Sequence, residues 1–347
     1  MPALAIVRRQ YPLARIVLLS NAQRHGRAPV AARTVLEGAG LVDRFLTYDA
    51  DLPRRDLPAM AVRLVREVRQ LRPSVAVYLA PSERPARAIA RDRFFFRLCG
   101  VREWIGFREI PRADLYPRDA GGRPGPVPHE AARKVARLVQ DGLAAPADAL
   151  TPPFFQWTPA ETDAVRRWLD PQRVAGRTLI AVCPTSNMSC KIWPLDRFVE
   201  IGRRLIDHAD VDLIVVGGLG DRQPGDRLIA EWGRGINSAG VFGFREAGAL
   251  VGQCDLHVGL DAGSTHLAAA AGVRCVVIAS DRDYPGQWDP LGIGHIIVRK
   301  RVACGGCYAV DCPTPGHPCI AGLSADDVWN AIVAGRVLAQ RSPGGEV

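Results

Sequence analysis

Lysine is scarce in this chain of 347 residues: of its 45 lysines and arginines, only Lys134, Lys191 and Lys300 are lysines. Long apolar runs are also missing, since stretches such as 211–218 fall far short of the roughly 20 residues that cross a bilayer. No block of like charges occurs, which argues against a nucleic-acid-binding tail. No basic segment leads into an apolar one at the N-terminus, so no signal peptide is visible. These absences predict a soluble, cytoplasmic protein.

The composition that is present is close to a globular average. Hydrophobic residues make up 48% and charged residues 23%, which excludes disordered, collagen-like and coiled-coil chains. At roughly 100–200 residues per domain, the length predicts two domains. The net charge of +9 is spread along the chain and favours anionic ligands, such as nucleotide phosphates or acidic lipid headgroups. Five of the nine cysteines stand singly, which fits a reducing compartment: Cys99, Cys183, Cys190, Cys254 and Cys275.

Short β-rich runs alternate with amphipathic helical patterns, and this alternation predicts parallel sheets built from βαβ units. Strands are expected at residues 15–20, 44–48, 74–79, 178–183, 211–216, 255–260, 274–279 and 295–298. Helices are expected at residues 2–9, 57–71, 129–143 and from 324 to about 340. Another helix begins at Thr158, because Thr158-Pro159-Ala160-Glu161 is a capping box with proline at the first helical position.

The pattern predicts an α/β protein with two Rossmann-like lobes. We place the first lobe at residues 1–157 and the second at 158–323, followed by a C-terminal helix and tail at 324–347. The boundary falls in the stretch 144–176, where the capping box starts a new unit.

A polar turn with a lysine follows the expected strand at 178–183. The turn contains Ser186 and Asn187 and leads to Lys191. Open α/β sheets bind ligands beyond the carboxyl ends of their strands, and a lysine ammonium can hold a phosphate there. Because lysine is so scarce, its use at this point favours a function. The alternative is an ordinary surface loop with Trp193 packed in the core.

A second candidate site is the run Leu260-Asp261-Ala262-Gly263-Ser264-Thr265-His266. Here a strand passes through a glycine-containing turn into an alanine-rich helix that ends at Gly272. The free N–H groups and the dipole at the start of such a helix favour a diphosphate. Gly263 allows close approach of the backbone, and Ser264 adds a hydroxyl donor. His266 lies on the first turn, which favours ligand contact over a purely structural role.

A glycine-rich turn, Gly217-Gly218-Leu219-Gly220-Asp221, follows the expected strand at 211–216. It does not match Gly-x-Gly-x-x-Gly, so the dinucleotide fingerprint is absent. Asp221 stands where a carboxylate can accept hydrogen bonds from ribose hydroxyls. A solvated turn aspartate is an equally weighted alternative.

Four cysteines fall within 16 residues: Cys304, Cys307, Cys312 and Cys319. The Cys-x2-Cys spacing suits a tetrahedral thiolate site, and four sulfurs would close it as a structural zinc or iron site. The pairs lie nearer together than in common zinc ribbons. A knuckle of reduced thiols, or one redox-labile disulfide, is the alternative.

Three of these segments carry a resemblance to a known family. The run 191–198, Lys-Ile-Trp-Pro-Leu-Asp-Arg-Phe, resembles the Lys-x-Trp-Pro-x-x-x-Phe signature of the ADP-heptose:lipopolysaccharide heptosyltransferases, glycosyltransferase family 9. The run 261–269 is similar to the family motif Asp-Ser/Thr-Gly-x-x-His-Leu-Ala-Ala, with Ala262 in place of the usual hydroxyl. The cysteine cluster with Gly316-His317 resembles the C-terminal segment of heptosyltransferase-II-like members. The resemblance covers essentially the whole chain.

The resemblance implies two lobes of the GT-B type, with a nucleotide sugar in the C-terminal lobe. It implies an inverting, metal-independent transfer of a heptose, or a related sugar, from a donor such as ADP-heptose to a lipopolysaccharide core or a similar surface glycan. It also implies that catalysis needs no cofactor and that no nucleic acid is a partner. The reaction would take place in the cytoplasm, with peripheral association at the inner face of the cytoplasmic membrane.

Residue roles follow from the resemblance by position. Lys191 would neutralise the departing diphosphate. The implied donor contacts are Ser186, Asn187, Lys191, Asp221, Asp261, Gly263, Ser264 and His266.

The chain departs from the family at its start. Family members open with a β-strand and a Gly-Asp loop, whose aspartate is the proposed general base, whereas Met1-Pro2-Ala3-Leu4 already matches the helix after that loop. No residue of this sequence is therefore assigned as the base, and we expect the natural reading frame to continue upstream by about 15–25 residues, which is enough for a strand and its loop.

Alternative functions follow from these features. A catalytically degenerate paralogue that only binds a sugar nucleotide is one, because the base is unassigned. A zinc-ribbon nucleic-acid module is another; it rests on the cysteines and the charge alone and predicts salt-dependent binding of DNA or RNA. The run 91–97, with three phenylalanines among arginines, is interpreted as a helix that buries all three rings; contact with a membrane or the acceptor is its alternative.

Overall fold

A computed structural model of the chain describes residues 1–22, 32–49, 51–155 and 157–338. The described residues of 1–117 and 127–150 form a compact unit 1, and those of 118–126 and 151–347 form a compact unit 2. Both units are α/β, so the predicted fold class with parallel sheets is confirmed. The division after residue 157 stays a prediction.

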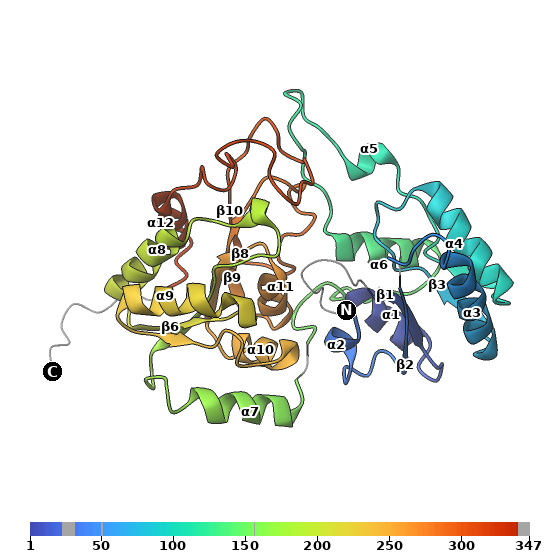
Figure 1. Cartoon of the computed structure of the whole chain (residues 1–347), viewed down its shortest axis with the longest axis horizontal. Helices are drawn as coiled ribbons and strands as arrows, with labels where there is room; N and C mark the ends of the chain where they lie inside the picture. The colour runs from blue at the N-terminus through green and yellow to red at the C-terminus, as the bar shows by residue number, and fades with distance from the viewer. Residues whose placement is uncertain (23–31, 50, 156, 339–347) are drawn as a thin grey trace. The chain divides into compact units, whose positions relative to one another are not determined.

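Unit 2 is built on a six-stranded sheet with the order β10-β9-β8-β5-β6-β7, in which every neighbouring pair is parallel (Figure 1). The strands are β5 (Thr178–Cys183), β6 (Val211–Val215), β7 (Ile236–Asn237), β8 (Leu256–Leu260), β9 (Arg274–Ala279) and β10 (Ile296–Arg299). Strands β6 and β8 are buried along their whole length, as continuous apolar runs are in a sheet covered on both faces.

Helices cover both faces of this sheet. Among the described residues of unit 2, the α-helices are α7 (Pro159–Leu169), α8 (Leu195–His208), α9 (Arg222–Trp232), α10 (Phe244–Val251), α11 (Gly263–Ala270) and α12 (Ala325–Ala334). One core joins the sheet to α8, α9 and α12, and the other joins it to α7, α10 and α11. Leu205 in the first core and Leu250 in the second are fully buried. Burial of such a side chain stabilises the folded state by about 1.5–3 kcal/mol.

Unit 1 holds two two-stranded parallel sheets within its described residues. Strand β1 (Val17–Ala22) pairs with β2 (Arg44–Asp49), and β3 (Val75–Val77) pairs with β4 (Glu103–Ile105). The helices are α1 (Pro2–Gln10), α2 (Ala32–Leu36), α3 (Leu57–Gln70), α4 (Ala86–Leu98), α5 (Arg112–Leu115) and α6 (Glu130–Gln140). Ile6 of α1, Leu138 of α6 and Ile105 of β4 share one core, while Leu64 of α3 packs with Leu46 of β2.

Several features differ from the sequence-based expectation. The short strands β4 and β7 were not predicted, and neither were the helices α2, α5, α8, α9 and α10. Helix α12 ends at Ala334 rather than near residue 340, because Gly335 follows and Arg336 adopts a left-handed φ of 48°. The three phenylalanines of α4 are not all buried, since Phe94 is 62% exposed. Among the helices of the described ranges, none combines the length and the apolar character that crossing a membrane requires.

Candidate functional site

Polar loops follow four neighbouring strands of the unit 2 sheet at one edge. Because β5, β6, β8 and β9 are parallel, their carboxyl ends lie at the same edge, and β5 stands between β6 and β8. The loops that follow contain Ser186, Asp221, Asp261 and Asp283. The fold therefore brings together the three motifs predicted from the sequence, where open α/β sheets bind ligands.

Lys191 lies at the centre of this edge, between two carboxylates. It ends a short 3-10 helix, η1 (Ser189–Lys191), and is 8% exposed. Its Nζ lies 2.6 Å from Oδ2 of Asp261 and 3.2 Å from Oδ2 of Asp283. The ammonium is therefore fixed in place rather than free to sample solvent.

A second cation completes this cluster. Nη1 of Arg282 lies 2.6 Å from Oδ1 of Asp283, and Nε of the same guanidinium donates to the carbonyl of Ala309 at 2.8 Å. Two buried cations thus face two buried carboxylates, which offsets the cost of burying each charge alone. We name Lys191, Asp261, Arg282 and Asp283 the ion cluster.

Helix α11 starts beside Asp261 without a side-chain cap. Its N-cap residue is Ala262, and no side chain there accepts a hydrogen bond from the first turn. The Thr265 hydroxyl instead donates to the carbonyl of Leu260 at 2.6 Å, which ties the turn to the end of β8. The first N–H groups of α11, at Gly263 and Ser264, and the positive end of its dipole are therefore suited to an anion.

His266 borders both the ion cluster and an aromatic side chain. Its Nε2 lies 3.9 Å from Oδ1 of Asp261, and its ring centroid lies 6.5 Å from that of Trp288. Desolvation by the surrounding protein lowers the pKa of His266, and the Asp261 charge opposes that shift only in part. The imidazole is therefore neutral at neutral pH, so it is a hydrogen-bonding group rather than a cation.

The other predicted donor contacts lie in the loops after β5 and β6. The Ser186 hydroxyl accepts from the Met188 N–H at 3.3 Å, and Asn187 is exposed in the same turn. Asp221 closes the 3-10 helix η2 (Leu219–Asp221), where its Oδ2 accepts from the Gly218 N–H at 2.7 Å. The carboxylate of Asp221 thus caps its own turn.

Reasoning from the sequence missed three residues of this site: Arg282, Asp283 and Trp288. They belong to the segment after β9, which opens with the polar run Ser280-Asp281-Arg282-Asp283 directly after a buried strand. The same rule that singled out Lys191, polar residues beyond the carboxyl end of a buried strand, would have found this run.

The predicted metal site at the four cysteines is not supported. Cys304 and Cys307 are exposed, Cys312 is partly buried and Cys319 is buried. Within the described part of the chain, no three His, Cys, Asp or Glu side chains are arranged to hold a metal ion. All four are free thiols, and together with Cys190 they line a cavity of about 30 Å³.

Unit 1 contains a buried polar cluster that the sequence did not suggest. Oε1 of Glu130 accepts from the Ser82 N–H at 2.9 Å and pairs with Lys134, while Nη2 of Arg137 donates to the carbonyl of Ala80 at 2.8 Å. Among the described residues, Oε2 of Glu130, the Ser82 hydroxyl and Nη1 of Arg133 are buried without a hydrogen-bond partner. Such atoms are costly to bury unless water or a ligand satisfies them.

Comparison with known proteins decides the family. The sequence of residues 131–316, more than half of the chain, matches the family model of glycosyltransferase family 9 (heptosyltransferase). The chain belongs to this family. It is therefore a glycosyltransferase, and the family resemblance of the Lys191 and Asp261 motifs is confirmed.

Solved structures agree with this assignment at the level of the fold. A glycosyl transferase family 9 protein from Veillonella parvula has a TM-score of 0.70 at 17% identity, covering 96% of this chain and 92% of that chain. The E. coli ADP-heptose lps heptosyltransferase II has a TM-score of 0.62 at 17% identity, covering 96% and 93%. The E. coli heptosyltransferase WaaC with ADP has a TM-score of 0.62 at 13% identity, covering 96% and 94%. The search of curated proteins found no match.

Proposed function

We propose that this glycosyltransferase moves a heptose, or a related sugar, from a nucleotide donor to a lipopolysaccharide core or a similar surface glycan, with inversion at the anomeric carbon. ADP-heptose is the first donor to test, because similar folds carry that donor or ADP in their names. The observation that carries the proposal is the ion cluster beside the uncapped start of α11.

The donor diphosphate would lie between Lys191 and the start of α11. Negative charge grows on the diphosphate as the glycosidic bond breaks, and fixed positive groups stabilise it most effectively where water is excluded. Lys191 supplies that charge, and the N–H groups of Gly263 and Ser264 supply hydrogen bonds. Ser186 and Asn187 would add donors, and His266 with Asp261 would order the turn.

The nucleoside would extend toward the loop after β6. Asp221 lies in that loop, next to Gly217 and Gly218, and its second carboxylate oxygen is proposed to accept from a ribose hydroxyl. Position 217 requires glycine, because a Cβ there would lie 2.6 Å from Oδ2 of Asp221.

Metal independence is proposed from the charges that the chain itself supplies. Lys191 is buried at the edge of the sheet, Arg282 pairs with Asp283 beside it, and the dipole of α11 adds a partial positive charge. We propose that Lys191 and the start of α11 neutralise the leaving diphosphate, which is the work that a divalent cation would otherwise do.

The acceptor is proposed to bind unit 1. Ser82 follows the carboxyl end of β3, the position at which open α/β sheets bind ligands, and its N–H joins it to the buried Glu130 of α6, which also carries Arg133 and Arg137. A glycolipid acceptor would bring the enzyme to the cytoplasmic face of the membrane. We also propose that the first lobe ends at residue 157 and that the second lobe ends at residue 323.

A transfer assay tests the proposal. The purified chain is incubated with ADP-heptose and a heptose-free lipopolysaccharide core, and ADP release and the anomeric configuration of the product are measured by NMR. We expect ADP release that depends on the acceptor and a product of inverted configuration. Binding of ADP-heptose without transfer to any core acceptor would instead identify a sugar-nucleotide-binding paralogue.

A further inference from the structure

Helix α4 of unit 1 exposes apolar side chains among arginines. Phe95 and Phe96 pack into the cores of unit 1, whereas Phe94 is 62% exposed and Leu98, one turn later, is 47% exposed. Arg93 and Arg97 flank them and are exposed as well. We name Arg93, Phe94, Arg97 and Leu98 the α4 patch.

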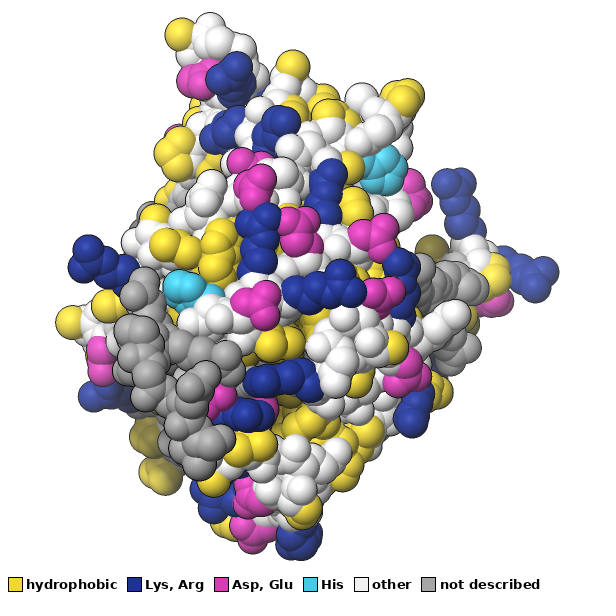
Figure 2. All heavy atoms as spheres, turned by 90° about the vertical axis from the view of Figure 1, so that its left-hand side faces the viewer, with side chains coloured by type: hydrophobic (Ala, Val, Ile, Leu, Met, Phe, Trp, Pro, Cys, Tyr) yellow, Lys and Arg dark blue, Asp and Glu magenta, His cyan; other side chains and the backbone are white. Residues whose placement is uncertain are grey.

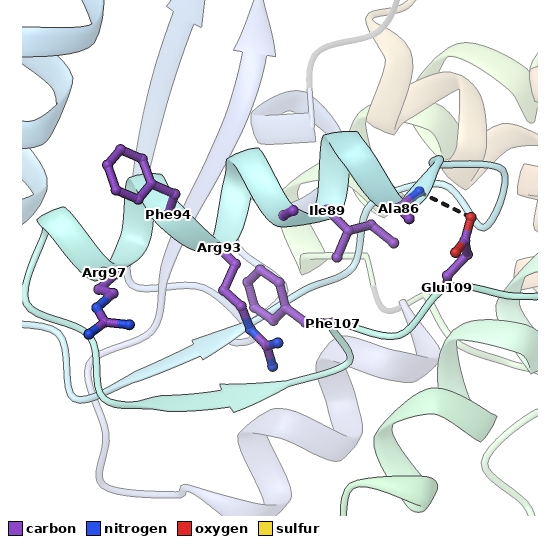
Figure 3. A pocket seen from close by; sticks show the side chains of 8 residues that line it. Ala86, Ile89, Arg93, Phe94, Arg97, Phe107 and Glu109 are labelled. Carbon is purple, nitrogen blue, oxygen red and sulfur yellow. Dashed lines mark hydrogen bonds between the residues drawn. The ribbon is translucent and has the colours of Figure 1, made fainter.

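A groove runs alongside this patch. It encloses about 380 Å³ and is lined by Ala86, Ile89, Ala90, Arg93, Phe94, Arg97, Phe107 and Glu109. In Figure 3, Arg93 lies beside the ring of Phe107, and its guanidinium carbon is 5.8 Å from the ring centroid. The only carboxylate in the lining, Glu109, accepts from the Ala86 N–H at 3.0 Å. The groove is therefore lined mainly by apolar side chains, with the two guanidinium groups of Arg93 and Arg97 among them.

The net charge of α4 is positive. The helix contains four arginines and one aspartate, a net charge of +3, and that aspartate, Asp92, is already engaged by Tyr78, Arg84 and Arg91. Helix α3 packs against α4 and adds three exposed arginines: Arg63, Arg66 and Arg69. By contrast, cations and anions are interspersed over the face that Figure 2 shows.

We propose that the α4 patch docks on a bilayer of anionic phospholipids. Phe94 and Leu98 insert at the boundary between headgroups and acyl chains, the groove receives part of one acyl chain, and Arg93 and Arg97 pair with lipid phosphates. Arginine suits this role because its apolar stem lies along the hydrocarbon while its guanidinium stays among the headgroups. An acidic protein partner is the alternative occupant, and it predicts no binding to anionic vesicles. The inference deepens the membrane association of the proposed function by naming the surface that makes the contact, and it does not depend on sugar transfer.

Vesicle sedimentation of the full chain tests this proposal in the absence of donor and acceptor. Vesicles of phosphatidylcholine alone are compared with vesicles that contain equal parts of phosphatidylcholine and phosphatidylglycerol. We expect binding to the anionic vesicles only, weakened by added salt. Each arginine near an anionic surface adds about 1 kcal/mol, or roughly fivefold in binding, so Arg93→Gln with Arg97→Gln should lower the partition coefficient about 25-fold.

Matched variants separate docking from folding and from charge alone. Arg166→Gln with Arg167→Gln removes two exposed arginines of α7 and should leave vesicle binding unchanged. Because Arg93 contacts Trp104 and Phe107, the variants Arg97→Gln and Phe94→Ser are tested separately, since neither removes those contacts. The control for removing an exposed apolar side chain is Ile293→Ser, at a side chain that is 97% exposed. Equal binding of wild type and the α4 variants to anionic vesicles, or no binding by wild type, overturns the proposal. Transfer to a delipidated core should be the same in all of these variants, so this outcome is independent of the proposed function.

Discussion

At the scale of single residues, Lys191 links catalysis to stability. We expect Lys191→Ala to lower sugar transfer on the order of 10²–10³-fold, because one preorganised charge on the leaving group is lost. The same change should lower the melting temperature, because Asp261 loses its cation at 2.6 Å while Asp283 keeps Arg282. Turnover and thermal unfolding of the variant are measured together.

Lys300 provides the matched control for that change. It is the other lysine of unit 2, it is exposed, and its Nζ donates to the carbonyl of Gly322. Lys300→Ala should keep wild-type turnover. If Lys191→Ala turns over at the wild-type rate with saturating donor, Lys191 does not stabilise the leaving group.

His257 makes stability depend on pH. It is fully buried on β8, both ring nitrogens lack a partner among the described residues, and burial lowers its pKa to about 3 from an ordinary value of 6.5. Below about pH 6.5, His257 therefore becomes protonated in the unfolded chain, whereas it stays neutral in the folded chain until the pH approaches 3. The contribution of His257 to the free energy of unfolding is therefore complete above about pH 6.5 and is lost as the pH falls. At about pH 5 the loss is about 2 kcal/mol.

Urea unfolding at several pH values measures this effect. His257→Leu should flatten the loss between about pH 6.5 and pH 5. A residual slope is expected, because burial also lowers the pKa values of His266 and His295. An unchanged slope in the variant would mean that His257 is not the group responsible.

At the scale of elements, α11 lacks the side-chain cap that α6, α7 and α12 have. Ala262 adopts an extended conformation, with φ −144° and ψ 177°, that a capping serine also adopts. Ala262→Ser should therefore raise the free energy of unfolding by about 1 kcal/mol. Urea denaturation measures the gain, and Ala262→Val, which offers no hydroxyl, should give none. A serine variant no more stable than the valine variant would show that capping is not limiting here.

The sequence predicts elements best where one local signal is strong. Strands β5 and β9 have the bounds expected from their apolar runs, and α7 begins at the expected capping box of Thr158 and Glu161. Strands β4 and β7 span three and two residues, too few for a period to appear in the sequence, and pairing with a neighbouring strand defines them instead. Tertiary contacts, rather than local propensity, make these two strands.

The candidate site was predictable as separate motifs but not as an arrangement. The scarcity of lysine pointed to Lys191, and the start of α11 pointed to Asp261. The pairing of Lys191 with Asp283 joins loops after β5 and β9, strands that are not neighbours, so no spacing in the sequence encodes it. The four cysteines show the opposite case, where a suggestive spacing does not produce a metal-binding arrangement.

At the scale of the whole molecule, the two units have separate cores. Both cores of unit 2 consist of residues from position 157 onward, whereas the other three consist of residues up to position 150. A ligand that contacts only the ion cluster and α11 should therefore stabilise unit 2 directly. Hydrogen exchange can resolve such an effect by region, because amides open in local units with their own free energies.

We therefore expect ADP to slow amide exchange in unit 2 and to leave unit 1 unaffected. A ligand at 100 times its dissociation constant adds about 2.7 kcal/mol, so amides that exchange by unfolding of unit 2 should slow roughly 100-fold. The strongest change should fall in segments 186–191 and 261–266, with a smaller change at 217–221 near the ribose. Helices α1 and α6 serve as the internal reference. Equal protection of both units, or protection confined to unit 1, would place the nucleotide elsewhere and remove the donor roles of Lys191 and Asp221.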